Sequence, residues 1–115
     1  MILLGGSSWC KRASANVLFF AERYLIPVTV GFRRQDIFDN ESSVFCGAFG
    51  TSVAPSLLQR FEEVDLLLVI GSRLGEMTTN GYDIFNDRVK QNLWPIYVKT
   101  PQLINVKIGK KIIFY

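Results

Sequence analysis

Residues 65–73, DLLLVIGSR, constrain the fold more than any other stretch of this 115-residue chain. A run of branched apolar side chains stops abruptly at Gly71-Ser72-Arg73, as a buried parallel strand does when its carboxyl end faces a ligand crevice. Near the start, Ile2-Leu3-Leu4 runs into Gly5-Gly6-Ser7-Ser8 in a similar way. Two such strands predict a nucleotide-type binding sheet rather than a self-contained enzyme.

The first thirty residues predict a βαβ unit, which is almost always a right-handed crossover. A strand is expected at 2–5, and Ser7 or Ser8 is expected to cap the helix that follows. Pro27 ends that helical segment, and a second strand is expected at 28–30. The helix has an apolar stripe at helical spacing, made of Ala13, Val17, Phe20, Ala21 and Tyr24.

Residues 33–52 predict a long irregular loop with a short strand at 44–46, and such loops usually carry function or meet a partner. Pro55 suits the first position of a second helix. Further strands are expected at 66–70 and 95–98, and residues 100–115 form an atypical basic tail. The buried stripe of the second helix is predicted to be Ala54, Leu57, Leu58 and Phe61.

Composition removes several function classes. The chain has no histidine, which excludes Ser-His-Asp and Cys-His catalysis, and we assign no catalytic and no metal-binding residue. No apolar run approaches the ~20 residues of a membrane span, and no signal peptide is recognised, so a cytoplasmic protein without a membrane partner is expected. Cys10 and Cys46 are predicted to be buried, reduced thiols.

Charge is divided unevenly along the chain. Residues 1–85 carry seven basic and nine acidic residues, whereas residues 86–115 carry six basic residues and one acidic residue. The lysines of the tail are interleaved with apolar residues and match no nucleic-acid-binding motif, so no nucleic-acid partner is expected. Glu62, Glu63 and Asp65 are interpreted as a solvated turn on the edge opposite the crevice, and Asp36 and Asp39 as turn-forming carboxylates.

Two small-residue loops are the candidate binding sites. In the first, Gly5, Gly6 and Ser7 could bring backbone amides and a helix N-terminus to a phosphate, or could simply form a tight turn. In the second, Gly71 permits close approach, Ser72 offers a hydroxyl, and Arg73 can grip a phosphate bidentately. The alternative for Arg73 is an ion pair with Glu76. Trp9 could stack on a ligand ring or pack under the sheet.

Several separated motifs in this order resemble the central domain of thiamine-diphosphate-dependent enzymes, in the acetolactate synthase and benzoylformate decarboxylase-like branch. The resemblance covers about residues 2–99 and departs from the family after Thr100. The motifs are Gly5 to Trp9, Ile26 to Val28, Phe32 to Phe38, Gly47 to Gly50, and Asp65 to Glu76.

The resemblance implies an α/β, Rossmann-like three-layer sandwich of the DHS-like NAD/FAD-binding type, with a mostly parallel sheet that lacks its sixth strand. It implies that residues 1–115 are one central domain and a fragment of a larger enzyme. Thiamine diphosphate and Mg²⁺ would be bound by flanking pyrimidine- and diphosphate-binding domains absent here, and the intact enzyme would be a homo-oligomer.

Some members of the family bind FAD or ADP in the crevice of this domain. By resemblance, such a ligand would meet Gly5, Gly6 and Ser7, then Gly47 and Gly50, then Gly71, Ser72 and Arg73. Leu74 to Met77 stand where FAD-binding members have an aromatic residue and an acidic pair, which argues against FAD. An empty site or a weakly held adenine nucleotide is expected.

Three functions follow as hypotheses. The first is the middle domain of a thiamine-diphosphate-dependent 2-oxo acid decarboxylase or carboligase, without catalysis by itself. The second is a stand-alone nucleotide-binding module. The third is a non-catalytic module that docks on an enzyme through residues 33–52.

Overall fold

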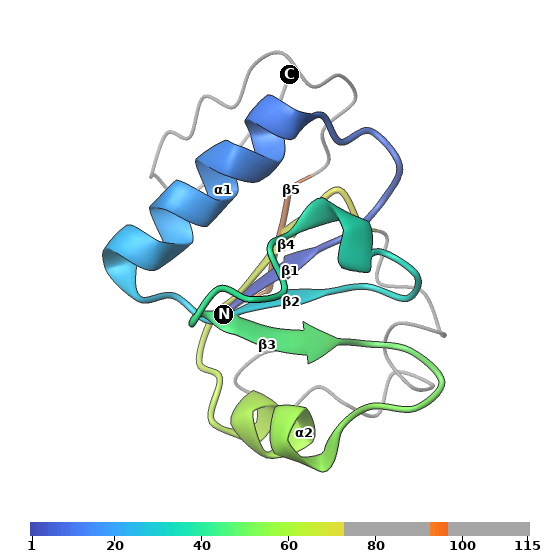
Figure 1. Ribbon diagram of the computed structural model, residues 1–115. Coiled ribbons are helices and arrows are strands. Elements are labelled where there is room, and N and C mark those ends of the chain that lie inside the picture. The colour runs from blue at the N-terminus through green and yellow to red at the C-terminus, as the bar shows by residue number, and fades with distance from the viewer. Residues whose placement is uncertain (73–92, 97–115) are drawn as a thin grey trace.

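The computed structural model describes residues 1–72 and the strand at residues 93–96. In this part of the chain, α1 (Lys11–Tyr24) covers one face of a parallel sheet and α2 (Pro55–Glu62) covers the other, as Figure 1 shows. The predicted α/β fold with a parallel, Rossmann-like sheet is confirmed.

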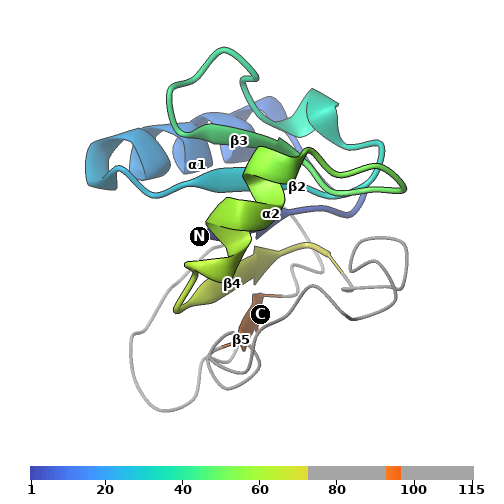
Figure 2. The ribbon, with the colours of Figure 1, turned by 90° about the horizontal axis from the view of Figure 1, so that it is seen from below.

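The sheet has the strand order β3-β2-β1-β4-β5, and every neighbouring pair is parallel (Figure 2). The strands at 2–5, 28–30 and 66–70 are confirmed to within one residue. The third strand begins one residue later and ends two residues later than predicted, and the fifth begins and ends two residues earlier. The strands are β1 (Ile2–Leu4), β2 (Val28–Val30), β3 (Phe45–Ala48), β4 (Leu67–Ile70) and β5 (Leu93–Ile96).

Alternation along the strands divides the core into two clusters, because successive side chains of a strand point to opposite faces. Ile2 and Leu4 face α1, where they meet Val17 and Ala21 of that helix. Leu3 faces α2 and belongs to the cluster of Leu57, Phe61, Leu67 and Val69. The sheet is therefore apolar on both faces, which is why its strands read as continuous apolar runs.

The first helix differs from its prediction in its N-terminal cap and in part of its apolar stripe. It begins at Lys11, and Cys10 at the N-cap makes no side-chain cap bond, so the predicted Ser7 or Ser8 cap is wrong. Of its predicted stripe, Phe20 and Tyr24 are 44% and 60% exposed. Only one side of α1 lies on the sheet, and these two rings instead pack on each other, with centroids 5.0 Å apart.

The second helix begins at Pro55 as predicted, with Leu57 and Phe61 buried. Ala54 and Leu58 are exposed, so that half of its predicted stripe is wrong. An eight-residue helix lying on a sheet buries a narrow i, i+4 stripe, and these two residues lie beside it.

The region 33–52 is more regular than expected, because it contains a 3₁₀ helix, η1 (Gln35–Ile37), and β3. Ile37 and Phe38 of this region are buried in the cluster beneath α1. The cysteines differ from prediction as well. Cys10 is exposed and Cys46 is half-buried, so the prediction that both thiols are buried is wrong, whereas the prediction that both are free is confirmed.

Leu25 ends α1 in a conformation that favours glycine. Its φ is 52° and its side chain is 78% exposed, so packing does not offset the strain of the left-handed region. The amides of Leu25 and Ile26 close the helix by donating to the carbonyls of Glu22 and Ala21, which is the Schellman pattern.

Leu25→Gly is therefore expected to raise the free energy of unfolding by about 0.5–1 kcal/mol, since strain of about 1–2 kcal/mol is relieved against the extra chain entropy of glycine. Urea denaturation of both proteins measures the difference. Leu58→Gly, the same change inside α2, is the control and should lower stability by about 1 kcal/mol. A loss of stability in both variants would contradict the strain at Leu25.

Candidate functional site

The carboxyl ends of β1 and β4 meet at one edge of the sheet. The register pairs Leu4 with Ile70, so the turns that follow these two residues are neighbours. From β1 the chain continues to β2 on one side, whereas β4 lies on the other side. This is the point where the strand order reverses, and open α/β sheets bind ligands at such a point. The prediction that the two glycine turns border one edge is confirmed.

The two glycine turns contact each other directly. The amide of Gly5 donates to the carbonyl of Ile70 over 3.0 Å. A Cβ on Gly5 would lie 2.7 Å from Cβ of Ser72, and one on Gly71 would lie 2.6 Å from the Gly5 carbonyl oxygen. A Cβ on Gly6 would overlap the Gly71 carbonyl oxygen. Gly6 and Gly71 also have φ of 76° and 71°. The contact thus requires glycine at all three positions.

This contact accounts for Gly5, Gly6 and Gly71 without any ligand. The tight turn proposed as the alternative from sequence is therefore present, and a phosphate-binding role for these glycines stays a prediction. Ser72 is buried beside Gly5, and Ser7 is exposed in the loop that leads to α1. Arg73, the phosphate-gripping residue of the prediction, lies outside the described residues.

Trp9 closes the first loop. Its indole Nε1 donates to the Gly5 carbonyl oxygen over 2.6 Å, and its ring packs against the cluster beneath α1. Of the two interpretations of Trp9, the structure supports packing. The hydrogen bond holds the carbonyl of Gly5 against Gly71, so Trp9 helps to position the second turn as well.

The remaining predicted positions, Gly47 and Gly50, are separated by the end of β3. Gly47 lies within the strand with φ of 111°, and its carbonyl accepts a hydrogen bond from the buried Thr29 hydroxyl over 2.8 Å. Gly50 follows the strand at the carboxyl edge, where a Cβ would lie 2.8 Å from Cδ2 of Phe32. Gly5, Gly6, Gly71 and Ser72 thus form one group, whereas Gly50 follows β3 and contacts Phe32 of the loop after β2.

A third loop at this edge belongs to the region 33–52, which was predicted to carry function, although its arginines were not predicted as site residues. Arg33 and Arg34 follow β2, and Asp36 forms an ion pair with Arg34 at 3.2 Å. The sequence did hold a signal, since two adjacent arginines begin two residues after Gly31, which closes the strand predicted at 28–30. Asp39 is a turn former as expected, because its carboxylate accepts the Glu41 amide.

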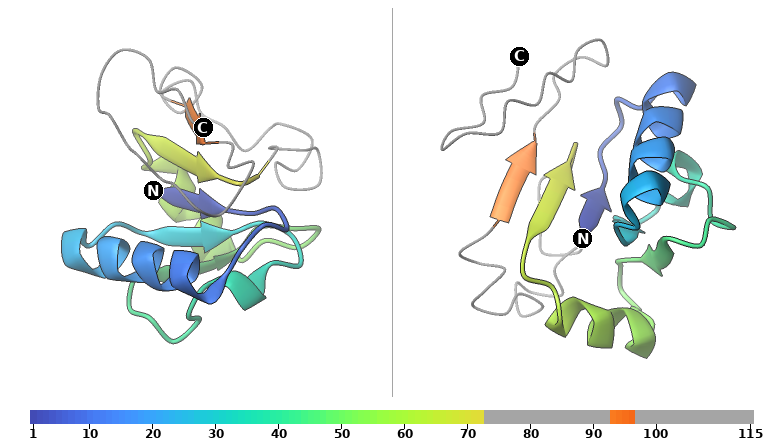
Figure 3. Two further views of the ribbon diagram at one scale, coloured as in Figure 1. Left: turned by 90° about the horizontal axis from the view of Figure 1, so that it is seen from above. Right: turned by 90° about the vertical axis from the view of Figure 1, so that its left-hand side faces the viewer.

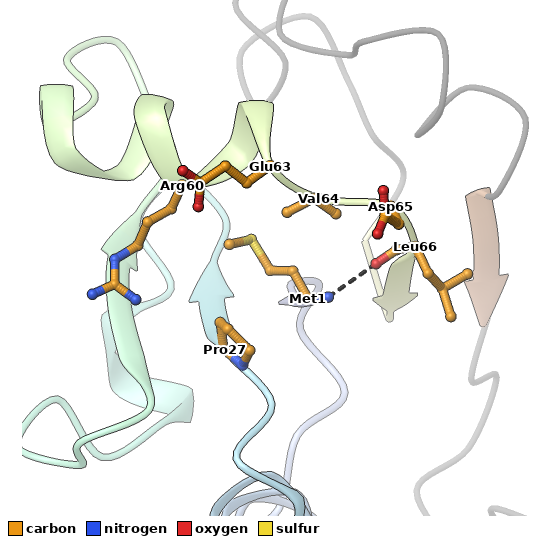
Figure 4. A pocket seen from close by; sticks show the side chains of 7 residues that line it. All are labelled: Met1, Pro27, Arg60, Glu63, Val64, Asp65 and Leu66. Atoms are coloured by element: carbon orange, nitrogen blue, oxygen red, sulfur yellow. Dashed lines mark hydrogen bonds between the residues drawn. The ribbon is translucent and has the colours of Figure 1, made fainter.

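A shallow pocket of about 340 Å³ lies at the opposite, amino edge of the sheet (Figure 4). The α-amino group of Met1 donates to the Leu66 carbonyl over 2.9 Å there, and burial lowers the pKa of this amine below its usual value near 8.0. Nearby Cys46 and Asp65 oppose that shift. The pocket is lined by Met1, Pro27, Arg60, Glu63, Val64, Asp65 and Leu66.

The pocket and the glycine turns lie at opposite ends of the strands, so one small ligand cannot occupy both. Glu62, Glu63 and Asp65 are exposed at the amino edge, as the sequence predicted. Within residues 1–72 and 93–96 no three His, Cys, Asp or Glu side chains gather as metal ligands would. In the same residues, no helix has the length and apolarity of a membrane span.

Residues 1–110 match the family described as thiamine pyrophosphate enzyme, central domain. The chain belongs to this family. The family assignment confirms the resemblance drawn from the separated motifs, and the parallel sheet with a helix on each face is the fold that the resemblance implied.

Two curated proteins have sequences that match this chain. Sulfoacetaldehyde acetyltransferase of Rhodobacter capsulatus is 28% identical over 110 residues, which are 95% of this chain and 17% of that protein. Acetolactate synthase large subunit of Parasynechococcus marenigrum is 27% identical over 90 residues, 78% of this chain and 15% of that protein. The central-domain chain thus spans about one sixth of the length of these relatives.

The contact between the turns predicts a large cost for a side chain at Gly71. Gly71→Ala should lower the free energy of unfolding by more than about 2 kcal/mol, because a left-handed φ is combined with a backbone overlap. Gly47→Ala is the control: its φ is also positive, but the nearest atom would be 3.7 Å away, so only strain of about 1–2 kcal/mol is expected. Equal losses in chemical denaturation would show that the two turns do not touch.

Proposed function

We propose that this chain is the middle domain of a larger thiamine-diphosphate-dependent 2-oxo acid decarboxylase or carboligase of the acetolactate synthase-like kind. The observation that carries the proposal is the family match over residues 1–110, together with two relatives about six times as long. In such an enzyme the domain would separate and orient its neighbours, and it would perform no catalysis by itself. Residues 1–115 would then be a single domain within a longer protein.

The cofactor would be held elsewhere in that protein. Thiamine diphosphate supplies the carbanion chemistry of such enzymes when bound. The described residues offer no grouping of acidic, histidine or cysteine side chains for Mg²⁺, so they do not fit the metal that would accompany the cofactor. This supports placing both groups in flanking pyrimidine- and diphosphate-binding domains. We further propose that the whole protein is a cytoplasmic homo-oligomer, with neither nucleic acid nor a membrane as a partner.

One face of α1 supports contact with a neighbouring domain. Phe19, Phe20, Tyr24 and Leu25, together called the α1 aromatic face, are 44–78% exposed. Figure 3 shows that α1 lies on the outside of the sheet. Together they expose on the order of 500 Å² of side chain, less than the ~800 Å² that each partner of a stable complex buries. A domain linked through the same polypeptide binds at high effective concentration and needs less area.

The decisive experiment uses the reading frame around this segment. The longer product should release CO₂ from a 2-oxo acid only when thiamine diphosphate is added, and the 115-residue chain alone should release none. A frame without a thiamine-diphosphate-binding segment, or thiamine-independent turnover by the short chain, would overturn the proposal.

The α1 aromatic face gives a further test. Phe19→Gln combined with Leu25→Gln should change the stability of the 115-residue chain by no more than about 0.5 kcal/mol, since both side chains are exposed. In the longer protein the same pair should lower the melting temperature and the activity. Lys11→Gln with Arg12→Gln, at the other end of α1, is the matched control and should change neither. Unaltered behaviour of the longer protein would exclude this face as the interface.

The second candidate is a stand-alone nucleotide-binding module. The meeting of Gly5, Gly6, Ser7, Gly50, Gly71 and Ser72 near one edge favours it, because nucleotides bind at such edges. Gly47 and Arg73 complete the predicted set by resemblance. ADP is the proposed ligand and FAD the weaker alternative. Calorimetric binding of ADP, but not FAD, by the short chain would favour this module.

A further inference from the structure

The segment after β2 is fixed between the ends of its two neighbouring strands. Gly31 donates to the Leu4 carbonyl at the end of β1, and Phe49 donates to the Val30 carbonyl. The ring of Phe32 lies against Gly50. Arg33 and Arg34 are therefore held at the carboxyl edge, beside the loop that begins at Gly5.

Arg33 occupies a position at which glycine would make the fold more stable. The amide of Arg34 donates to the Gly31 carbonyl over 3.1 Å, which closes a four-residue turn with Arg33 as its third residue. The φ of Arg33 is 58°, the left-handed value for which glycine is preferred at that position. The side chain is exposed, and its guanidinium lies 4.9 Å from the centre of the Phe32 ring.

Arg34 carries a buried donor without an acceptor. Its Nη2 pairs with the Asp36 carboxylate at 3.2 Å, while its Nε is buried and has no hydrogen-bond partner. A buried N–H of a charged group is costly to leave unpaired, so this atom calls for an explanation, of which a bound water or ion is one. Asp36 is 66% exposed, so its side chain is free to yield to a competing anion.

We propose that Arg33 and Arg34 form a binding site for a phosphate-type oxyanion at the carboxyl end of β2. The Arg34 side chain is 25% exposed, and its Nη end, which already meets the Asp36 carboxylate, can donate to the oxygens of a tetrahedral anion. Arg33 adds a second positive charge, and its ring contact with Phe32 pre-orients it. The strained turn places two arginines next to each other. Of the two, only Arg34 has a carboxylate partner in an ion pair among the described residues. The site stands independently of the proposed domain role and of the glycine turns.

Calorimetric titration of the 115-residue chain with pyrophosphate, ADP and adenosine tests the site. Pyrophosphate and ADP should bind, more weakly at higher salt, whereas adenosine should not. Arg34→Gln should weaken pyrophosphate binding at least tenfold. Arg12→Gln, which removes an exposed charge on α1, is the control and should change it less than twofold. Equal affinity for pyrophosphate and ADP identifies the phosphate alone as the ligand, and tighter ADP binding identifies a nucleotide.

Two further variants separate an anion site from a merely structural ion pair. Arg33→Gly should weaken pyrophosphate binding while raising the melting temperature, because glycine relieves the backbone strain. Asp36→Asn should tighten binding, because it removes the competing carboxylate. If Arg34→Gln does not fold, these two variants still decide the question.

The proposal is overturned if the wild-type chain binds no pyrophosphate at millimolar concentration, or if Arg33→Gly and Asp36→Asn leave its affinity unchanged. Binding that Arg12→Gln weakens as much as Arg34→Gln also overturns it, since the attraction would then be non-specific. None of these outcomes bears on thiamine-dependent activity of the longer protein, so the two proposals fail separately.

Discussion

The parallel pairing of β1 with β4 is the constraint on which the rest of this structure depends. Once Leu4 is paired with Ile70, the chain must turn away from two adjacent strands at the same level. The two turns then lie so close together that a side chain would overlap the opposite turn, and glycine at three positions avoids this overlap. The Trp9 indole fixes the result by bonding to Gly5. The positions of the turns after β1 and β4 follow from this pairing.

The two helices that cover the sheet differ in how much apolar surface they leave exposed. The face toward α2 includes the edge-on contact of Phe49 and Phe61, at 5.0 Å between centroids, and its helix leaves few large apolar side chains outside. The other face is covered by a longer helix with aromatic residues on its outer side. The described part of the chain therefore has an apolar core on both faces of the sheet and still exposes apolar surface on α1.

The sequence predicted the strands well and the loops poorly, for physical reasons. A continuous apolar run such as Leu67 to Ile70 is typical of a strand that is buried on both faces, so the local sequence is enough to predict it. The prediction that Ser7 or Ser8 caps α1 was wrong because the helix begins later, after a loop held by the hydrogen bond from Trp9 to Gly5. Such a loop contact cannot be predicted from the spacing of apolar residues. Phe20 and Tyr24 have helical spacing, but spacing does not tell which side of a helix another layer covers. The glycines were found, yet their packing against each other required the register of β1 and β4.

The bend at Gly47, whose carbonyl accepts the hydrogen bond of Thr29, affects how the edge of the sheet can pair with strands of other molecules. The register of β2 with β3 shifts between Val28 and Val30, and the positive φ of Gly47 bends the outer strand of the described sheet at that point. A bent margin is a poor template for a strand of another molecule, because its free amides and carbonyls no longer form a straight row. The β3 edge of the described sheet can thus stay unpaired without recruiting a strand of another copy.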